Sequence, residues 1–318
     1  MASLDTLTTD YHTITEACGL LDRSERGKLA LTGSDARGFL QGQVTNDVEA
    51  VPAGSGCYAA FLTPKGKMLG DLRILATDDE LLLDTERVAL QGLFNMIRRF
   101  SIGYDVQLHK RTLERGLLSL IGPGAAAVAG AGSLPGAEHS HMVVSIPGTS
   151  VSARAIRTDL GIDLLCDAAD TEVLRSTLEY AGAPPVTEAA VECLRVEHGR
   201  PRYGIDLDDS VIPQEAGLNE RAVSFTKGCY VGQETVARLY YRGKPNRQLR
   251  GLRLSAPASP GDALSFEGRT VGVLASVAGS PRLGPIGLAL VRREAQPGAR
   301  IAVAEGGDIT AEVIELPF

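Results

Sequence analysis

The chain has 318 residues, of which 44% are hydrophobic and 22% are charged, and its formal net charge is −7. This length predicts two or three domains of ordinary globular composition. The acidic balance argues against a general nucleic-acid-binding protein, so any anionic ligand has to be held by a local cluster of positive charge. No apolar run of about 18 residues is present, so no membrane span is expected.

The N-terminal sequence and the pattern of cysteines indicate the cellular compartment in which the protein is expected. The start, Met-Ala-Ser-Leu-Asp-Thr, has no basic region followed by an apolar core, so no signal peptide is expected. The five cysteines are dispersed and form no C-x-x-C pair: Cys18, Cys57, Cys166, Cys193 and Cys229. This pattern disfavours a disulfide framework or a structural zinc site and fits a reducing cytosol. We therefore expect a cytoplasmic protein in which four of the cysteines are small buried hydrophobic residues.

The first third of the chain predicts short strands and one strong helix. Short apolar runs bounded by Gly, Pro or acidic turns predict strands at Lys28–Thr32, Tyr58–Thr63, Leu72–Ala76 and Glu80–Asp84. Apolar residues at near-helical spacing then predict a helix over Glu86–Phe100, with Thr85 as its cap.

The middle third repeats this mixture. Strands are expected at Leu117–Ile121, Met142–Ile146, Val151–Arg157 and Ile162–Cys166. Helices are expected at Glu172–Ala181 and Glu188–His198, with Thr187 as the cap of the second. Because strands do not alternate strictly with helices, the pattern favours an α+β fold over a doubly wound sheet. The polar stretch Gly199–Ser224 is long for a connection, and such loops are usually functional or carry local structure.

The last quarter of the chain has a different character. Arg242–Asn246 is a credible boundary, after which only short strands are expected. These strands are Arg269–Val277, Ile286–Val291, Arg300–Ala304 and Ile309–Ile314, with a turn at Glu305–Gly307. The pattern predicts a small closed β-barrel over 246–318, preceded by α+β domains over 1–241.

Cys229 is the first candidate functional residue. It lies between Gly228 and Tyr230, two residues after Lys227, and just before a helix expected over Gln233–Tyr241. The positive end of a helix and a nearby lysine both favour the thiolate over the thiol. The alternative is a buried structural cysteine at a helix end, and the local sequence favours neither interpretation.

Glu197 is the second candidate. On the helix Glu188–His198 it falls among apolar residues that include Ala190, Cys193 and Leu194. A buried carboxylate needs hydrogen-bond donors, which a pterin or guanidine ligand would supply. From the residues alone, an internal salt bridge to an arginine, or exposure at a frayed helix end, is favoured.

The segment Thr63–Arg73 is the third candidate. It contains a Pro-Lys-Gly turn between two strands, with Asp71 near the start of the second strand. Lys65, Lys67 and Arg73 supply positive charge suited to an anionic tail. The alternative is an ordinary polar hairpin.

Two further patterns give weak signals. His139 and His141 form a close pair in a Gly/Ser/Pro-rich loop, which we expect to be exposed rather than metal-binding. Gly122–Ala127 formally matches the dinucleotide fingerprint G-x-G-x-x-A, but Gly130 and Gly132 break the helix that this motif requires.

The region around Cys229 carries a family resemblance. Its sequence, Lys227-Gly-Cys-Tyr-Val-Gly-Gln-Glu234, resembles at every fixed position the signature of the folate-binding YgfZ family. These proteins are relatives of the glycine-cleavage T-protein (aminomethyltransferase) and are linked to iron–sulfur cluster assembly or repair. Phe39–Val48, Leu194–Gly204 and Pro213–Leu218 resemble other segments of this superfamily, so the likeness covers roughly residues 30 to 250.

The resemblance implies a fold, a ligand and partners. The fold would be a ring of two interleaved, ferredoxin-like α+β domains, with an inner boundary near 50–115, and a C-terminal barrel around a folate-binding opening. The ligand would be non-covalent tetrahydrofolate, with no metal, and the partners would be iron–sulfur client proteins such as radical-SAM enzymes. The resemblance assigns the chemistry to Cys229, Lys227 and Asp71, and folate contacts to Glu197, Tyr203, Arg195, Asn46, Gly228, Tyr230 and Gln233.

One departure from the T-protein pattern bears on the activity. That pattern has two adjacent aspartates after a glycine pair, whereas here Gly70 stands in the first position and Asp71 in the second. Cys229 lies where T-protein has an Asp-Phe-Ile-Gly type of segment. Since amine activation needs a placed proton acceptor, the change favours an iron–sulfur accessory factor. Asp71 keeps open a folate-dependent aminomethyltransferase or demethylase, and a third alternative is a folate-binding scaffold in which Cys229 merely packs.

Overall fold

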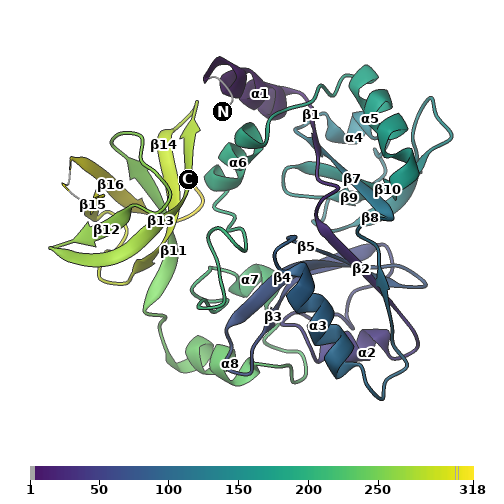
Figure 1. Cartoon of the computed structure of the whole chain (residues 1–318), viewed down its shortest axis with the longest axis horizontal. Coiled ribbons are helices and arrows are strands. Elements are labelled where there is room, and N and C mark those ends of the chain that lie inside the picture. The colour runs from purple at the N-terminus through teal and green to yellow at the C-terminus, as the bar shows by residue number, and fades with distance from the viewer. Residues whose placement is uncertain (1–3, 305, 307) are drawn as a thin grey trace.

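A computed structural model describes the chain at residues 4–304, 306 and 308–318. Three bodies lie at the corners of a triangle, with a β-barrel on one side and two sheet-containing units on the other (Figure 1). None of the helices among these described residues has the length and apolar character of a membrane-spanning helix.

The first unit is an antiparallel five-stranded sheet in the order β3-β4-β5-β2-β6. Its strands are β2 (Gly27–Thr32), β3 (Ser55–Leu62), β4 (Met68–Ala76), β5 (Leu81–Thr85) and β6 (Gln107–Lys110). The helices α2 (Ala36–Gln41) and α3 (Leu90–Phe100) bury Phe39, Leu93 and Ile97 against its apolar face. This burial removes large apolar side chains from water and holds the helices on the sheet.

The second unit is another antiparallel five-stranded sheet, in the order β1-β7-β10-β9-β8. Its elements are β1 (Gly19–Asp22), β7 (Arg115–Ile121), α4 (Ala125–Val128), β8 (His141–Ser145), β9 (Ser152–Arg157), β10 (Gly161–Asp167) and α5 (Thr171–Tyr180). Because β1 precedes the whole first sheet and β7 follows it, the first unit is inserted into the second. The two α+β units are therefore interleaved, as expected.

The helices after α5 connect the three bodies. They are α6 (Glu188–Glu197), α7 (Asn219–Ala222) and α8 (Gln233–Arg242), and α6 packs on the N-terminal helix α1 (Leu4–Glu16). The chain after α6 then returns to the first unit, where Leu207, Val211 and Tyr230 pack with Met68. The polar stretch Gly199–Ser224 is thus held against the first sheet and contains α7.

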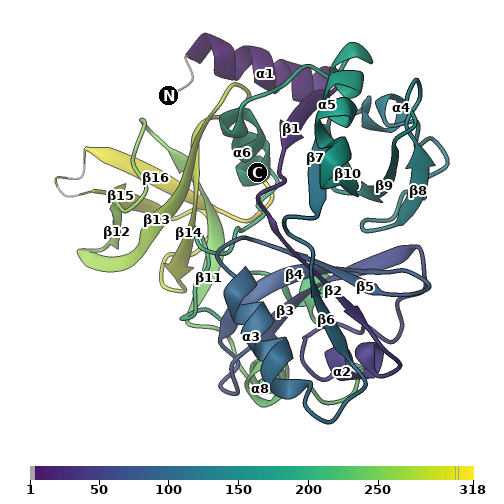
Figure 2. The ribbon, with the colours of Figure 1, turned by 45° about the vertical axis from the view of Figure 1, so that its right-hand side comes forward.

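The C-terminal body is a closed barrel in the order β11-β14-β13-β12-β15-β16, and β16 pairs back with β11 (Figure 2). Its strands are β11 (Arg247–Leu254), β12 (Ala263–Phe266), β13 (Arg269–Ser280), β14 (Gly284–Arg292), β15 (Arg300–Val303) and β16 (Ile309–Ile314). Inward-facing Leu252, Leu264 and Val313 form its core. The α+β class with a C-terminal small barrel is confirmed. Of the turn expected at 305–307, only residue 306 lies within the described residues.

Two helix caps differ from expectation. The helix expected from Glu86 begins at Leu90, and Thr85 ends β5 instead, where its hydroxyl donates to the backbone carbonyl of Asp71. Thr187 stands at the start of α6, but its hydroxyl makes no capping hydrogen bond. Neither helix therefore begins at a side-chain capping hydrogen bond.

Candidate functional site

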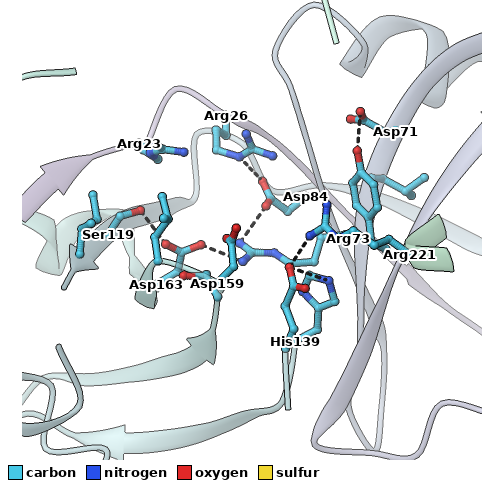
Figure 3. A pocket seen from close by; sticks show the side chains of 16 residues that line it. Arg23, Arg26, Asp71, Arg73, Asp84, Ser119, His139, Asp159, Asp163 and Arg221 are labelled. Atoms are coloured by element: carbon cyan, nitrogen blue, oxygen red, sulfur yellow. Dashed lines mark hydrogen bonds and ion pairs between the residues drawn. The ribbon is translucent and has the colours of Figure 1, made fainter. Parts of the chain in front are cut away.

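A polar cavity of about 180 Å³ lies between the two α+β units (Figure 3). We call it the central cavity; it is lined by Arg23, Arg26, Tyr58, Asp71, Leu72, Arg73, Asp84, Ser119, Ile121, Glu138, His139, Thr158, Asp159, Leu160, Asp163 and Arg221. These residues come from strands of both sheets and from the loops beside them. Titratable groups gathered in a cavity are typical of functional sites.

A chain of ion pairs crosses one wall of the central cavity. Arg26 pairs with Asp84 at 2.8 Å, Asp84 pairs with Arg73 at 2.8 Å, and Arg73 pairs with Asp163 at 2.7 Å. Burial raises the pKa of the Asp84 carboxyl, but the two guanidinium groups lower it by more, so its pKa is lowered overall. These charges satisfy one another and join the two sheets. Arg73 is therefore not free to hold an anionic tail, contrary to the expectation for its hairpin.

Asp71 is the acid of the cavity without an arginine partner. It is 5% exposed, and burial raises the pKa of its carboxyl to about 6. The Tyr58 hydroxyl donates to its Oδ2 at 2.7 Å, and the Arg221 guanidinium lies 5.1 Å from the centre of the Tyr58 ring. A carboxyl with a pKa near neutrality can accept a proton or hydrogen-bond donors from a ligand.

Replacing Asp71 by asparagine is expected to stabilise the protein by about 1–3 kcal/mol near pH 8. The folded-state pKa of Asp71, about 6, lies above its ordinary value of 3.8. Its protonation therefore stabilises the fold fully below about pH 4, and this contribution is lost as the pH rises through about 6. Urea unfolding should show a wide gap in the free energy of unfolding between variant and wild type near pH 8 and a narrow one near pH 4. A gap independent of pH contradicts the assignment, and the exposed Asp79→Asn is the control.

The two histidines are not exposed, so that expectation is wrong. His139 lines the central cavity, and burial lowers the pKa of its imidazole to about 3. His141 is buried between the Ser55 carbonyl oxygen, at 3.1 Å, and the Arg154 guanidinium, at 2.9 Å. Both side chains are neutral at physiological pH and bridge the two units.

Cys229 has a different environment from the other thiols. It is exposed, whereas Cys18, Cys166 and Cys193 are buried and Cys57 is half-buried. Burial raises the pKa of the Cys57 and Cys193 thiols to about 12. Since the thiolate is the reactive form, these thiols are inert at neutral pH. Cys229 lies outside the lining of the central cavity.

The loop that carries Cys229 is anchored at both ends. The Lys227 ammonium donates to the backbone carbonyl oxygens of Gln41, Val44 (2.7 Å) and Asn46 (2.9 Å) at the end of α2. Four residues later, the Val231 N–H donates to the Gly42 carbonyl at 3.2 Å. Burial lowers the pKa of Lys227 to about 8. Lys227 is thus an anchor of the loop, and its part in the chemistry stays a prediction.

The region around the Cys229 loop and the end of α2 brings together segments that are far apart in the sequence. The Asn46 amide donates to the carbonyl oxygens of Tyr58 (2.8 Å) and Arg221 (3.2 Å). Gly232 has φ +84°, and a Cβ there would lie 2.6 Å from the Thr63 carbonyl oxygen, so the Thr63–Lys67 turn packs directly on the start of α8. Only glycine fits this approach.

The structure gives most of the expected folate contacts other roles. Asn46 holds backbone, Tyr230 is 7% exposed in an apolar core, and Gln233 begins α8, while Gly228 is exposed beside Cys229. Arg195 pairs with Asp206 at 2.7 Å and donates to Ser276 Oγ at 2.6 Å, which fastens α6 to the barrel. Tyr203 is half-buried between two apolar cores of the first unit.

Glu197 is bound by protein donors rather than turned toward a ligand cavity. It is 2% exposed, and the Tyr11 hydroxyl donates to both of its oxygens, at 3.0 and 3.1 Å. The Ser280 hydroxyl donates to Oε1, and the Arg282 guanidinium donates to Oε2 at 3.0 Å. The Cys193 thiol lies 3.8 Å from Oε1. This is the internal ion pair that stood as the alternative, and a pterin contact at Glu197 stays a prediction.

Of the residues that the sequence singled out for a ligand or for chemistry, Asp71 and Arg73 line the central cavity. The cavity's other charged residues were not found from the sequence. Arg26, Asp84, Asp163 and Arg221 have no common motif, and only an expectation of which strands face each other would have grouped them.

Gly70 is enclosed by the packing of the first unit. A Cβ at this position would lie 2.6 Å from the Phe61 ring and 2.7 Å from the Ala89 methyl group. Phe61 is fully buried, so it has no room to move aside. An aspartate is therefore excluded from position 70 by the core itself.

Comparisons with known proteins agree with this architecture. The model of the GCVT N-terminal domain matches residues 3–227, and that of the glycine cleavage T-protein C-terminal barrel domain matches residues 247–318. A chloroplastic putative transferase of Arabidopsis thaliana is 30% identical over 308 residues, covering 94% of this chain and 71% of the relative. An aminomethyltransferase of Rubrobacter xylanophilus is 30% identical over 318 residues, covering 97% and 85%.

A solved structure shows the same fold. The glycine cleavage system aminomethyltransferase T from Bartonella henselae superimposes with a TM-score of 0.86 at 23% identity, covering 98% of this chain and 89% of that one. Together with the two matching domain models, which span most of the chain, these similarities show that it belongs to the glycine-cleavage T-protein family.

Proposed function

We propose that this protein is a tetrahydrofolate-binding accessory factor for iron–sulfur cluster assembly or repair in the cytoplasm, as in the YgfZ branch of its family, with Cys229 as the acting thiol. The observation that carries this proposal is the position of Cys229: it is the exposed cysteine of the chain, on a loop fixed at both ends. An exposed, fixed thiol is suited to contact a partner or a cluster. The third alternative, in which Cys229 merely packs, conflicts with its exposure.

The central cavity is the proposed site of the pterin head. Its volume of about 180 Å³ lies below the roughly 300–1,000 Å³ of pockets for whole drug-sized ligands, so it suits a ring head rather than all of folate. The tail of folate would leave the central cavity on the side of Arg23, away from Asp71. Pterin N–H groups would find their acceptor in Asp71.

Aminomethyl transfer is the second candidate function. It is favoured by the raised pKa of Asp71 and by relatives that are named aminomethyltransferase. Against it stands the exclusion of an aspartate at position 70, which leaves Asp71 as a single carboxyl. A single carboxyl group would then have to act as proton acceptor at a place where the T-protein pattern has two.

An assay for methylene transfer distinguishes the two functions. The protein is incubated with tetrahydrofolate and an aminomethyl donor, and 5,10-methylenetetrahydrofolate is followed over time. Our proposal predicts the rate seen with tetrahydrofolate and donor alone. Catalytic turnover that Asp71→Asn removes would establish the transferase and overturn the accessory role.

A further inference from the structure

The central cavity contains a cation that nothing in the described chain neutralises. Arg26, Arg73 and Arg221 each pair with a carboxylate. The Arg23 guanidinium pairs with none: among residues 4–304, 306 and 308–318 it has no acceptor, and its Nε is buried without a hydrogen bond. The cavity is thus incomplete at this position.

The backbone fixes where Arg23 lies. It follows β1 directly, and its N–H donates to the Leu117 carbonyl on β7 at 2.8 Å, which continues the ladder of the second sheet. Its side chain is half-buried and extends into the cavity beside Arg26 (Figure 3). The position is therefore set by a sheet edge rather than by a free loop.

Two neighbouring guanidinium groups in a partly buried cavity repel each other. Arg26 is neutralised by Asp84 and Glu86, but Arg23 keeps its charge and an unbonded N–H. An unpaired buried donor costs free energy, which a ligand acceptor removes on binding. Guanidinium is planar and matches a carboxylate with two parallel hydrogen bonds.

We propose that Arg23 binds a carboxylate group of the molecule that fills the central cavity. In Figure 3, Arg26 lies between Arg23 and Asp71. The cavity therefore offers an acceptor and a cation on opposite sides of Arg26. This inference rests on the proposed folate site, and the carboxylate comes either from the glutamyl tail of folate or from a separate small carboxylate bound beside the pterin.

The test compares Arg23→Gln with wild type by calorimetric titration with two ligands. Tetrahydrofolate has the glutamyl tail, and 6-methyltetrahydropterin has the ring without it. If the tail supplies the carboxylate, Arg23→Gln weakens tetrahydrofolate binding by about 10- to 100-fold and leaves the pterin affinity unchanged, and Arg23→Lys restores part of the loss. The exposed barrel residue Arg253, changed to glutamine, is the control.

Acetate tests whether Arg23 binds a small carboxylate that is not part of folate. This experiment does not depend on folate binding. If a small carboxylate binds here, acetate raises the melting temperature of wild type and Arg253→Gln but not of Arg23→Gln. Equal weakening of both pterin ligands, or unchanged affinity for both together with an equal acetate shift, overturns the role of Arg23. Failure of wild type to bind tetrahydrofolate overturns the proposed function, while the acetate comparison still decides on Arg23.

Discussion

Replacing Cys229 by serine is expected to abolish the restoration of iron–sulfur enzyme activity in cells that lack this protein. Serine has nearly the same shape, but its hydroxyl is a much weaker soft-metal ligand and nucleophile than a thiolate. Because Cys229 is exposed, the free energy of unfolding should change by no more than about 0.5 kcal/mol. The measurement is the activity of a radical-SAM enzyme in cells that express wild type, Cys229→Ser or Cys229→Ala at equal levels.

Cys57→Ser is the matched control for this experiment. Its half-buried thiol has a pKa raised to about 12 by burial, so it contributes no thiolate near neutrality. This variant should restore activity as wild type does. Full restoration by both Cys229 variants would remove the thiol from the mechanism.

Replacing Glu197 by alanine is expected to lower the free energy of unfolding by about 3–5 kcal/mol. The carboxylate joins two helices to the barrel, because Tyr11 lies on α1, Glu197 on α6, and Ser280 and Arg282 at the end of β13 and the turn after it. Its removal leaves buried hydroxyl donors without an acceptor. Urea unfolding of the purified variant measures the loss.

Two variants calibrate this result. Arg282→Ala should cost less, because the Arg282 side chain is 58% exposed and Tyr11 and Ser280 still hold the carboxylate. Glu234→Ala, in the exposed first turn of α8, should cost no more than about 0.5 kcal/mol. A decrease in the free energy of unfolding of less than about 1 kcal/mol for Glu197→Ala would contradict the role of this carboxylate in holding α1, α6 and the barrel together.

The strands were largely predictable because alternation with a period of two and Gly/Pro turns are local signals. The barrel strands β13, β14 and β16 follow this rule. The helix α1 was not predicted, although Leu4, Leu7, Tyr11 and Ile14 recur at helical spacing, because its sequence is rich in threonine, a β-branched residue of low helix propensity. It is held by packing of Tyr11 and Ile14 with α6 residues, which are more than 170 positions away in sequence.

The candidate site was predictable only in part, for the same reason. Helical periodicity identified Glu197 as a buried carboxylate, but its donor Tyr11 lies 186 positions away. Arg26 and Asp84 are 58 positions apart, and Arg73 and Asp163 are 90 apart. These pairs arise because one α+β unit is inserted into the other. The sequence identified single residues that require a hydrogen-bond or ion-pair partner, whereas the topology of the chain determines which residue becomes that partner.

Titration of the protein with tetrahydrofolate tests the central claim most directly. Wild type is expected to bind one equivalent, and Asp71→Ala is expected to weaken binding by about 10- to 100-fold, because pterin N–H groups lose a charged acceptor. The control Glu234→Ala should bind as wild type does. No heat of binding with wild type, or equal affinity of the Asp71→Ala variant, would contradict a folate site in the central cavity.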